Sequence, residues 1–229
     1  MLVIAHRGAS AHLPDNTLEA FRAAVAQGAD GVELDVRRTS DGRLALSHDA
    51  ELADGRLVVE TAFGALPPEV ADLSSALDVC RPLSVVNTEI KNWPDDGDFD
   101  PTERLAADVV ALLVARGELA DGRNLVSSFH LPTIDRVRAL APELATGWLL
   151  GFTDDLGPLV DLAAAHGHVA VHPHHALVTG DLVRRAHEAD LAVNTWTCDE
   201  PDRIRWLQDI GVDAVITNAP DEARAALGR

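Results

Sequence analysis

Two histidines, an arginine and a pair of carboxylates lie before residue 50, each near the end of an expected strand. His6 and Arg7 close a short apolar strand that starts at residue 2. Glu33 and Asp35 lie two positions apart in an expected strand over residues 32–37, so their side chains share a face. Two carboxylates aimed together repel each other unless a cation lies between them. The segment therefore predicts a cation site beside an imidazole.

A hairpin is expected after this strand because Asp41 and Gly42 form a common two-residue turn. Such a turn pairs His48 with Asp35 on the neighbouring strand. One imidazole would then fold back over the paired carboxylates, while His6 would approach them from another strand. One segment of the sequence thus contains both the carboxylate pair and the two histidines that would approach it.

A second polar pair lies in an expected strand over residues 84–91. Glu89 and Lys91 are two positions apart and share a face, so both can point into one cavity. A carboxylate beside a lysine is most often a plain ion pair. The residues by themselves leave both interpretations open.

The sequence predicts strands and helices that alternate strictly along the chain, and these strands would position the polar residues. The expected strands cover residues 2–8, 32–37, 84–91, 124–129, 145–150, 169–172, 191–197 and 213–217. Eight strand–helix pairs favour a closed TIM (β/α)₈ barrel of the α/β class, with a short hairpin or insertion after the second strand. No glycine-rich dinucleotide motif follows the first strand. In a barrel, the carboxyl ends of all strands share one mouth, which would bring the polar residues together.

Further short motifs accompany these pairs along the whole chain. They are His6-Arg7-Gly8, Pro14-Asp15-Asn16-Thr17, Glu33-Leu34-Asp35-Val36, Thr39 to Gly42, His48-Asp49, Glu89-Ile90-Lys91, Ser127-Ser128-Phe129, Trp196-Thr197, Gly211-Val212-Asp213 and Thr217-Asn218. At these residues the chain resembles the glycerophosphodiester phosphodiesterase family. Asp15 is a mild departure, because the family more often has Glu there.

This resemblance implies a TIM barrel of the phospholipase C-like phosphodiesterase type. It also implies an enzyme that hydrolyses glycerophosphodiesters to sn-glycerol 3-phosphate and an alcohol. A divalent cation would be held by Glu33, Asp35 and Glu89. Three oxygen ligands suit Mg²⁺ or Ca²⁺, with Mn²⁺ as an alternative, better than zinc.

The same resemblance assigns roles to the remaining polar residues of the expected mouth. His6 and His48 would form the catalytic acid and base pair, in either order. Arg7 and Lys91 would contact the phosphate, and Trp196 would wall the glycerol pocket.

A group of histidines between His166 and His175 invites comparison with a zinc site. It lacks a helical pair four residues apart followed by an acid, and His166 and His168 flank the far end of their strand. We therefore predict no zinc site there. His172, near the other end of that strand, is predicted to line the substrate pocket.

The length and the net charge limit the classes of protein to which the chain can belong. The 229 residues fit one barrel domain over residues 1–229, and a net charge of −18 disfavours nucleic acid and anionic membranes as partners. No signal-type start or bilayer-spanning apolar run is present, so we expect a soluble, cytoplasmic enzyme that does not insert into membranes. Its partner would be a small-molecule phosphodiester. The oligomeric state stays open.

Three other features complete the expectations. Cys80 and Cys198 are expected to be lone buried thiols. The aspartate-rich loop over residues 92–100 does not match an EF-hand, and we expect it to be solvated. The segment over residues 50–68 is short for the family, which suggests an open pocket.

Rival functions remain on the sequence alone. A phospholipase D-like lipid phosphodiesterase of the same architecture would need an apolar rim. A metal-dependent barrel aldolase or isomerase would need only one histidine and no arginine beside it. A non-catalytic ligand-binding barrel is also compatible with the fold.

Overall fold

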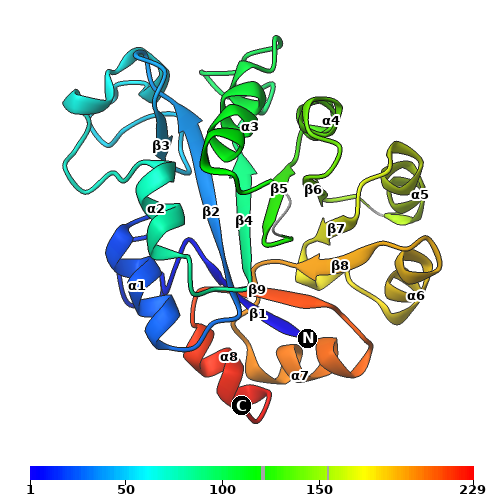
Figure 1. Ribbon diagram of the computed structural model, residues 1–229. Helices are drawn as coiled ribbons and strands as arrows, with labels where there is room; N and C mark the ends of the chain where they lie inside the picture. The colour runs from blue at the N-terminus through cyan, green and yellow to red at the C-terminus, as the bar shows by residue number, and fades with distance from the viewer. Residues whose placement is uncertain (120–121, 154) are drawn as a thin grey trace.

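Parallel strands in the middle of the molecule are surrounded by a ring of helices (Figure 1). The computed structural model describes residues 1–119, 122–153 and 155–229. The barrel strands in chain order are β1 (Leu2–His6), β2 (Gly31–Arg38), β4 (Val85–Ile90), β5 (Asn124–Ser128), β6 (Ala145–Leu150), β7 (Ala170–Pro173), β8 (Ala192–Thr195) and β9 (Ala214–Thr217). Neighbours in this order pair in parallel, and β1 pairs with both β2 and β9, so the sheet closes. The predicted (β/α)₈ barrel is confirmed.

The helices follow the strands in the order that the sequence predicts. They are α1 (Leu18–Ala26), α2 (Leu73–Val79), α3 (Arg104–Arg116), α4 (Leu131–Leu140), α5 (Gly157–His166), α6 (Gly180–Glu188), α7 (Pro201–Asp209) and α8 (Pro220–Ala226). Side-chain caps begin several of them: Thr17 accepts a hydrogen bond from the Ala20 N–H at α1, and Asp72 accepts one from the Ser75 N–H at α2. Short 3₁₀ turns lie at Val58–Glu60, Phe63–Ala65 and His175–Leu177.

The pattern along β2 explains how the barrel is filled. Val32, Leu34 and Val36 belong to the hydrophobic cluster between this strand and the outer helices. Glu33 and Asp35 occupy the alternate positions and are also buried. One face of the strand therefore stabilises the fold, while the other supplies polar side chains to the barrel interior.

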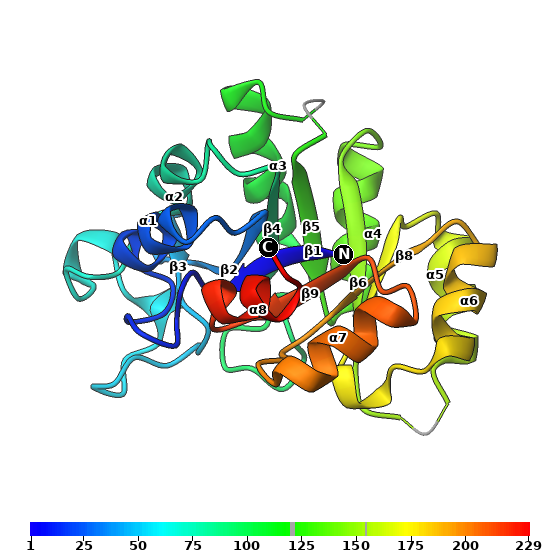
Figure 2. The same ribbon diagram turned by 90° about the horizontal axis from the view of Figure 1, so that it is seen from below.

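The two ends of the chain meet beside the barrel floor, as Figure 2 shows. The Arg229 guanidinium donates a hydrogen bond to the Met1 carbonyl oxygen at 3.1 Å and pairs with Asp30 at 3.0 Å. Both cysteines are buried and unpaired, as expected. Among the residues that the structure describes, no helix combines the length and the apolar character needed to cross a bilayer.

The hairpin after β2 corrects one prediction. Strand β3 (Leu44–Leu46) runs antiparallel to β2 with Val36 opposite Leu46, one position away from the expected register. Ser47, and not His48, therefore lies opposite Asp35, and its N–H donates to the Asp35 carbonyl oxygen at 3.2 Å.

The cause of this shift is a turn of three residues, where the sequence predicted two. The Gly42 N–H donates to the Thr39 carbonyl oxygen at 3.0 Å, and Gly42 has a φ of 81°. The Thr39 hydroxyl donates to Asp41 and accepts from the Arg43 N–H, which holds the extra residue in place. The Asp-Gly pair predicted the hairpin correctly but not its length.

Candidate active site

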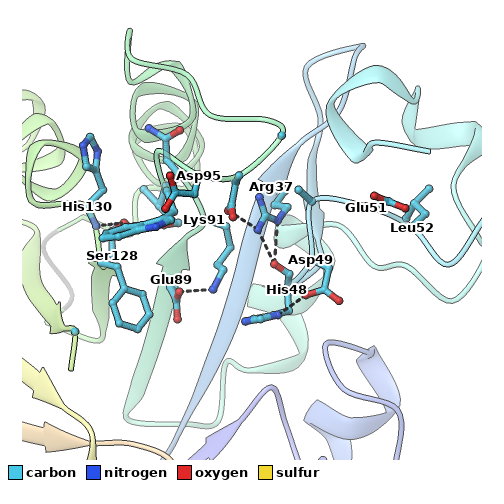
Figure 3. A pocket seen from close by; sticks show the side chains of 18 of the residues that line it. Arg37, His48, Asp49, Glu51, Leu52, Glu89, Lys91, Asp95, Ser128 and His130 are labelled. Atoms are coloured by element: carbon cyan, nitrogen blue, oxygen red, sulfur yellow. Dashed lines mark hydrogen bonds and ion pairs between the residues drawn. The ribbon is translucent and has the colours of Figure 1, made fainter. Parts of the chain in front are cut away.

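Two adjoining cavities open at the carboxyl ends of the strands. The inner cavity, of about 60 Å³, reaches between β1, β2 and β4. The outer cavity is a groove of about 920 Å³ that extends over the loops after β3, β4 and β5. Both cavities are lined by His48, Glu89, Lys91 and Phe129, so they adjoin at these residues. Figure 3 shows the groove.

Three buried carboxylates lie at this mouth. Asp35 on β2 is the register partner of Glu89 on β4, and Glu33 lies one inward-facing position earlier on β2. One oxygen from each of these residues lies within 4.8 Å of the others. Glu33 Oε1 and Asp35 Oδ1 accept no hydrogen bond from any residue that the structure describes. Buried carboxylate oxygens without donors are the ligands that a hard divalent cation takes, so these three residues fit a metal ion.

Burial and mutual repulsion disturb the ionisation of this group. Burial, together with the charges of Asp35 and Glu89, holds the pKa of Glu33 well above its usual range. Burial opposes ionisation of Asp35 as well, but Lys91 and Arg7 outweigh it and lower the pKa of that carboxyl. Burial also raises the pKa of Glu89. A cation among the three would favour the ionised form of each.

His6 ends β1 beside this group, and its hydrogen bonds determine which nitrogen carries the proton. The Asn218 amide nitrogen donates to Asp199 at 2.7 Å, which turns the amide oxygen toward His6. His6 Nδ1 donates to that oxygen at 2.7 Å. Nε2 then carries the lone pair and lies 3.9 Å from Glu33 Oε2. Burial and the neighbouring Arg7 lower the pKa of His6, which favours this neutral form.

His48 lies just after the hairpin, at the boundary between the inner cavity and the groove (Figure 3). Its Nδ1 donates to Asp49 Oδ1 at 2.7 Å. Its carbonyl oxygen accepts hydrogen bonds from the Arg37 guanidinium at 3.0 and 2.7 Å. The backbone is therefore held from β2, and the shifted hairpin register still brings the imidazole to the pocket.

Two basic side chains complete the inner cavity. Lys91 Nζ lies 2.6 Å from Glu89 Oε1 and 3.6 Å from Asp35 Oδ1. Arg7 Nε lies 3.0 Å from Asp35 Oδ2, and its Nη1 donates to Asp15 at 3.0 Å. Asp15 thus reaches Arg7 although its side chain is shorter than that of Glu.

Sequence reasoning missed the residues that hold the catalytic candidates in place. The Asn16 side chain donates to Asp35 Oδ2 at 2.8 Å and accepts from the Asp35 N–H at 3.1 Å. The Asn218 amide oxygen accepts from His6 Nδ1 at 2.7 Å and so orients the His6 ring. Both asparagines lie in motifs that the sequence showed only as a turn and a strand end. Phe129 and Asn87 also line the inner cavity.

Trp196 and His172, which the sequence assigned to one pocket, lie in different places. Trp196 walls the inner cavity, and its indole N–H donates to the His172 carbonyl oxygen at 2.7 Å. The His172 ring is fully buried and lines a cavity of about 240 Å³ at the opposite, amino end of the barrel. A Cβ on Gly147 would lie 2.5 Å from His172 Nε2, so the ring fills the space that this glycine leaves. The prediction that His172 lines the substrate pocket is therefore wrong.

The barrel and its polar mouth define a TIM-barrel enzyme, since active sites of this fold lie at the carboxyl ends of the strands. The model of the glycerophosphoryl diester phosphodiesterase family matches residues 6–74 and 59–222. The chain therefore belongs to this family and is a phosphoric diester hydrolase.

Similar proteins match this chain over nearly the full length of both. A glycerophosphodiester phosphodiesterase of Caldanaerobacter subterraneus is 28% identical, with 96% of this chain and 95% of that protein covered. A phosphodiesterase of Oleispira antarctica, solved in complex with the product sn-glycerol-3-phosphate, superposes with a TM-score of 0.83 at 24% identity and covers 100% of this chain and 97% of that one. A Thermotoga maritima glycerophosphodiester phosphodiesterase gives 0.83 at 24% identity, with 99% and 98% covered.

Proposed function

We propose that this enzyme hydrolyses glycerophosphodiesters to sn-glycerol 3-phosphate and an alcohol, and that it requires a divalent cation and a histidine pair. The observation that carries the proposal is the group of three buried carboxylates, with unsatisfied oxygens, beside His6 and His48. Family membership and the product complex of the Oleispira relative support the reaction class.

The cation would be held by Glu33, Asp35 and Glu89. When bound, it would polarise a phosphate oxygen and lower the pKa of an attached hydroxyl group. An all-oxygen donor set favours Mg²⁺ or Ca²⁺, and also accepts Mn²⁺.

The phosphate itself would lie between the carboxylates and the basic side chains. Lys91 would neutralise charge on the phosphate oxygens from β4, and Arg7 would do so from the end of β1. Both cations are already near Asp35, so their positions are maintained before substrate binds. Such preorganised charge lowers the barrier because the site needs no rearrangement during the reaction.

The histidines would move the protons. His6 has an unprotonated Nε2 and would accept a proton from the water molecule that attacks phosphorus. His48 lies at the groove side and, when protonated, would give its proton to the departing alcohol oxygen. The new P–O bond then forms as the bond between phosphorus and the alcohol oxygen breaks, and the net proton change at the pair is zero.

The direct experiment is to measure glycerol 3-phosphate release from diesters of choline, ethanolamine, glycerol and inositol. We expect release with a divalent cation and loss of release with a chelator. A failure to release product from every diester with metal present would refute the proposed function. Release that continues unchanged in the chelator would refute the metal requirement alone.

Replacement of either histidine tests the proton transfers. His6→Ala and His48→Ala should each lower kcat by about 10²- to 10⁴-fold, the usual contribution of one general acid or base. Circular dichroism and the unfolding midpoint serve as controls for folding. Full activity in either variant would exclude that histidine from the mechanism.

The rival lipid phosphodiesterase finds little support in the groove. Its lining mixes the acidic residues Asp49, Glu51 and Asp95 with apolar ones such as Leu52 and Trp93, whereas an enzyme acting on a lipid surface would need an uninterrupted apolar rim.

A further inference from the structure

A second group of possible metal ligands lies at the amino end of the barrel, away from the mouth. Asp135 lies on α4, His166 is the last residue of α5, and His168 lies two positions before β7. Helices α4 and α5 are neighbours in the outer ring (Figure 1). One possible ligand atom from each of the three residues lies within 4.8 Å of the others. The fold thus brings an acid and two imidazoles together at a place that the proposed reaction does not use.

His168 contributes a buried nitrogen atom without a hydrogen bond. Its side chain is fully buried, and its Nδ1–H can donate to the Thr146 hydroxyl at 2.8 Å, which leaves a lone pair on Nε2. Nε2 forms no hydrogen bond with any residue in the described ranges, although Asp135 Oδ1 lies 3.3 Å away. A buried polar atom without a partner costs free energy, and a metal ion would satisfy it. A hydrogen bond from the other ring nitrogen, as Thr146 accepts here, is what fixes the orientation of a metal-binding imidazole.

His166 supplies the second imidazole from a half-buried position. Its Nδ1 lies 2.9 Å and 3.0 Å from the two carboxylate oxygens of Asp135. Its ring stacks on that of His168, with 6.1 Å between the centroids and 26° between the planes. The ligand atoms of a tetrahedral zinc ion, with bonds of about 2.0–2.1 Å, lie about 3.3 Å apart. The distances from Asp135 to both imidazoles are therefore already close to those around a bound ion.

Another histidine of this chain shows what an ordinary surface pair looks like. His187 Nε2 lies 2.9 Å from Asp213 Oδ2, and both side chains are about as exposed as those of His166 and Asp135. Among the residues that the structure describes, no third histidine, cysteine or acid joins that pair at ligand distance. Asp135, in contrast, faces a second imidazole whose nitrogen is buried. This additional ligand distinguishes the group from a simple ion pair.

The donor set favours a transition metal of intermediate softness. Two imidazole nitrogens and one carboxylate oxygen suit Zn²⁺, whereas the all-oxygen group at the mouth suits Mg²⁺ or Ca²⁺. Water can reach a fourth position, because the side chains of His166 and Asp135 are 35% and 36% exposed. The sequence predicted no zinc site among these histidines because no acid follows them at ligand spacing. The structure supplies the acid from α4, 31 positions before His166.

We propose that Asp135, His166 and His168 form a zinc site, with water as the fourth ligand, that links α4 and α5 to the start of β7. The site is separate from the cation of the proposed reaction and does not depend on that reaction. Folding brings the three ligands together, so Zn²⁺ binds the folded chain more tightly than the unfolded chain. Zinc should therefore raise the unfolding temperature.

Anomalous diffraction at the zinc absorption edge locates the ion directly. Crystals of the full chain without a histidine tag would be grown with excess Mg²⁺, which occupies the oxygen ligands at the mouth, and then exposed to a lower concentration of Zn²⁺. We expect an anomalous peak between Asp135, His166 and His168. The absence of a peak at these three residues would overturn the proposal, whether or not zinc appears at the mouth.

A zinc titration in excess Mg²⁺, followed by the unfolding temperature, tests the site in solution. His166→Ala and Asp135→Asn change half-exposed side chains, and each variant is compared with itself with and without zinc. Each should weaken zinc binding by more than about 100-fold, since loss of a partner behind a ligand alone costs about 10- to 100-fold. His187→Gln breaks the matched surface pair and should keep the zinc response of the wild type. Equal zinc responses in the wild type and both ligand variants would refute the site.

A nearby positive charge predicts a change in the opposite direction. A Cβ on Gly167 would lie 2.7 Å from Arg138 Nη2, so this guanidinium lies beside the loop that carries both histidines. Its charge opposes the binding of a cation there. Arg138→Gln should therefore bind Zn²⁺ more tightly than the wild type in the same titration. An affinity that does not rise in this variant would place the ion elsewhere.

Discussion

His172 shows how one buried residue is controlled by its surroundings. Its Nε2 accepts a hydrogen bond from the Asn194 side chain at 3.1 Å, and its ring is fully buried and lines the cavity at the amino end of the barrel. Burial alone lowers the pKa of His172 to about 3. The imidazole is therefore neutral in the folded protein at pH values where an exposed histidine is charged.

This depressed pKa predicts a loss of stability in acid. The unfolded chain binds a proton at His172 below about pH 6.5, whereas the folded chain does not until about pH 3. His172 therefore does not reduce the free energy of unfolding above about pH 6.5. As the pH falls from there toward 3, the free energy of unfolding decreases by at most about 1.4 kcal/mol per pH unit.

Urea unfolding of the wild type and His172→Gln at neutral pH and at about pH 5 measures the effect. The wild type should lose more stability than the variant between the two conditions. His12→Gln, at an exposed position, should behave like the wild type. Parallel losses in the wild type and His172→Gln would contradict the assignment.

At the scale of elements, the turn between β1 and α1 positions two active-site candidates under tight steric limits. Arg7 has a φ of 57° and Gly8 a φ of 88°. A Cβ on Gly8 would lie 2.6 Å from the Ala20 carbonyl carbon in α1. The glycine thus lets the end of β1 approach the helix, which directs His6 and Arg7 into the mouth.

Gly8→Ala should therefore lower the free energy of unfolding by about 1–3 kcal/mol, because the new methyl group meets helix backbone and the positive φ is strained. Activity should fall as well, since His6 and Arg7 would move. Gly64→Ala is the matched control, with no atom within 4 Å of the new Cβ. If both variants unfold at the same denaturant concentration, the steric argument is wrong.

At the scale of the whole molecule, charge works against compactness. The chain carries 37 acidic and 19 basic residues. Most ion pairs on the surface contribute little to stability, so repulsion among the excess carboxylates is the larger effect. The buried carboxylates at the mouth add to it.

Sodium chloride should consequently stabilise the protein. Raising the salt from about 0.01 M to about 0.5 M shortens the screening length several-fold, which weakens repulsion across the surface. The unfolding temperature should rise, and the same increase in osmolality from sucrose distinguishes screening from solvent exclusion. A fall in the unfolding temperature with salt would show that ion pairs outweigh repulsion.

The sequence alone determined the features that depend on local periodicity. Alternating strands and helices predicted the barrel, and two-residue spacing placed Glu33 with Asp35, and Glu89 with Lys91, on common faces. These inferences succeeded because the direction of a side chain along a strand follows from its position. The resemblance to a family then joined them into one site.

Only the tertiary structure decided what depends on distant contacts or on one residue of register. The Thr39 hydroxyl holds a hairpin turn that is one residue longer than predicted, and the His172 ring occupies the space that Gly147 leaves inside the barrel. Arg37 forms ion pairs with Asp96 and Asp98, which belong to a loop that the sequence predicted to be solvated. Asn16 and Asn218 hold the site from turns far along the chain. Each of these contacts joins atoms that only folding brings together, so no local sequence pattern predicts it.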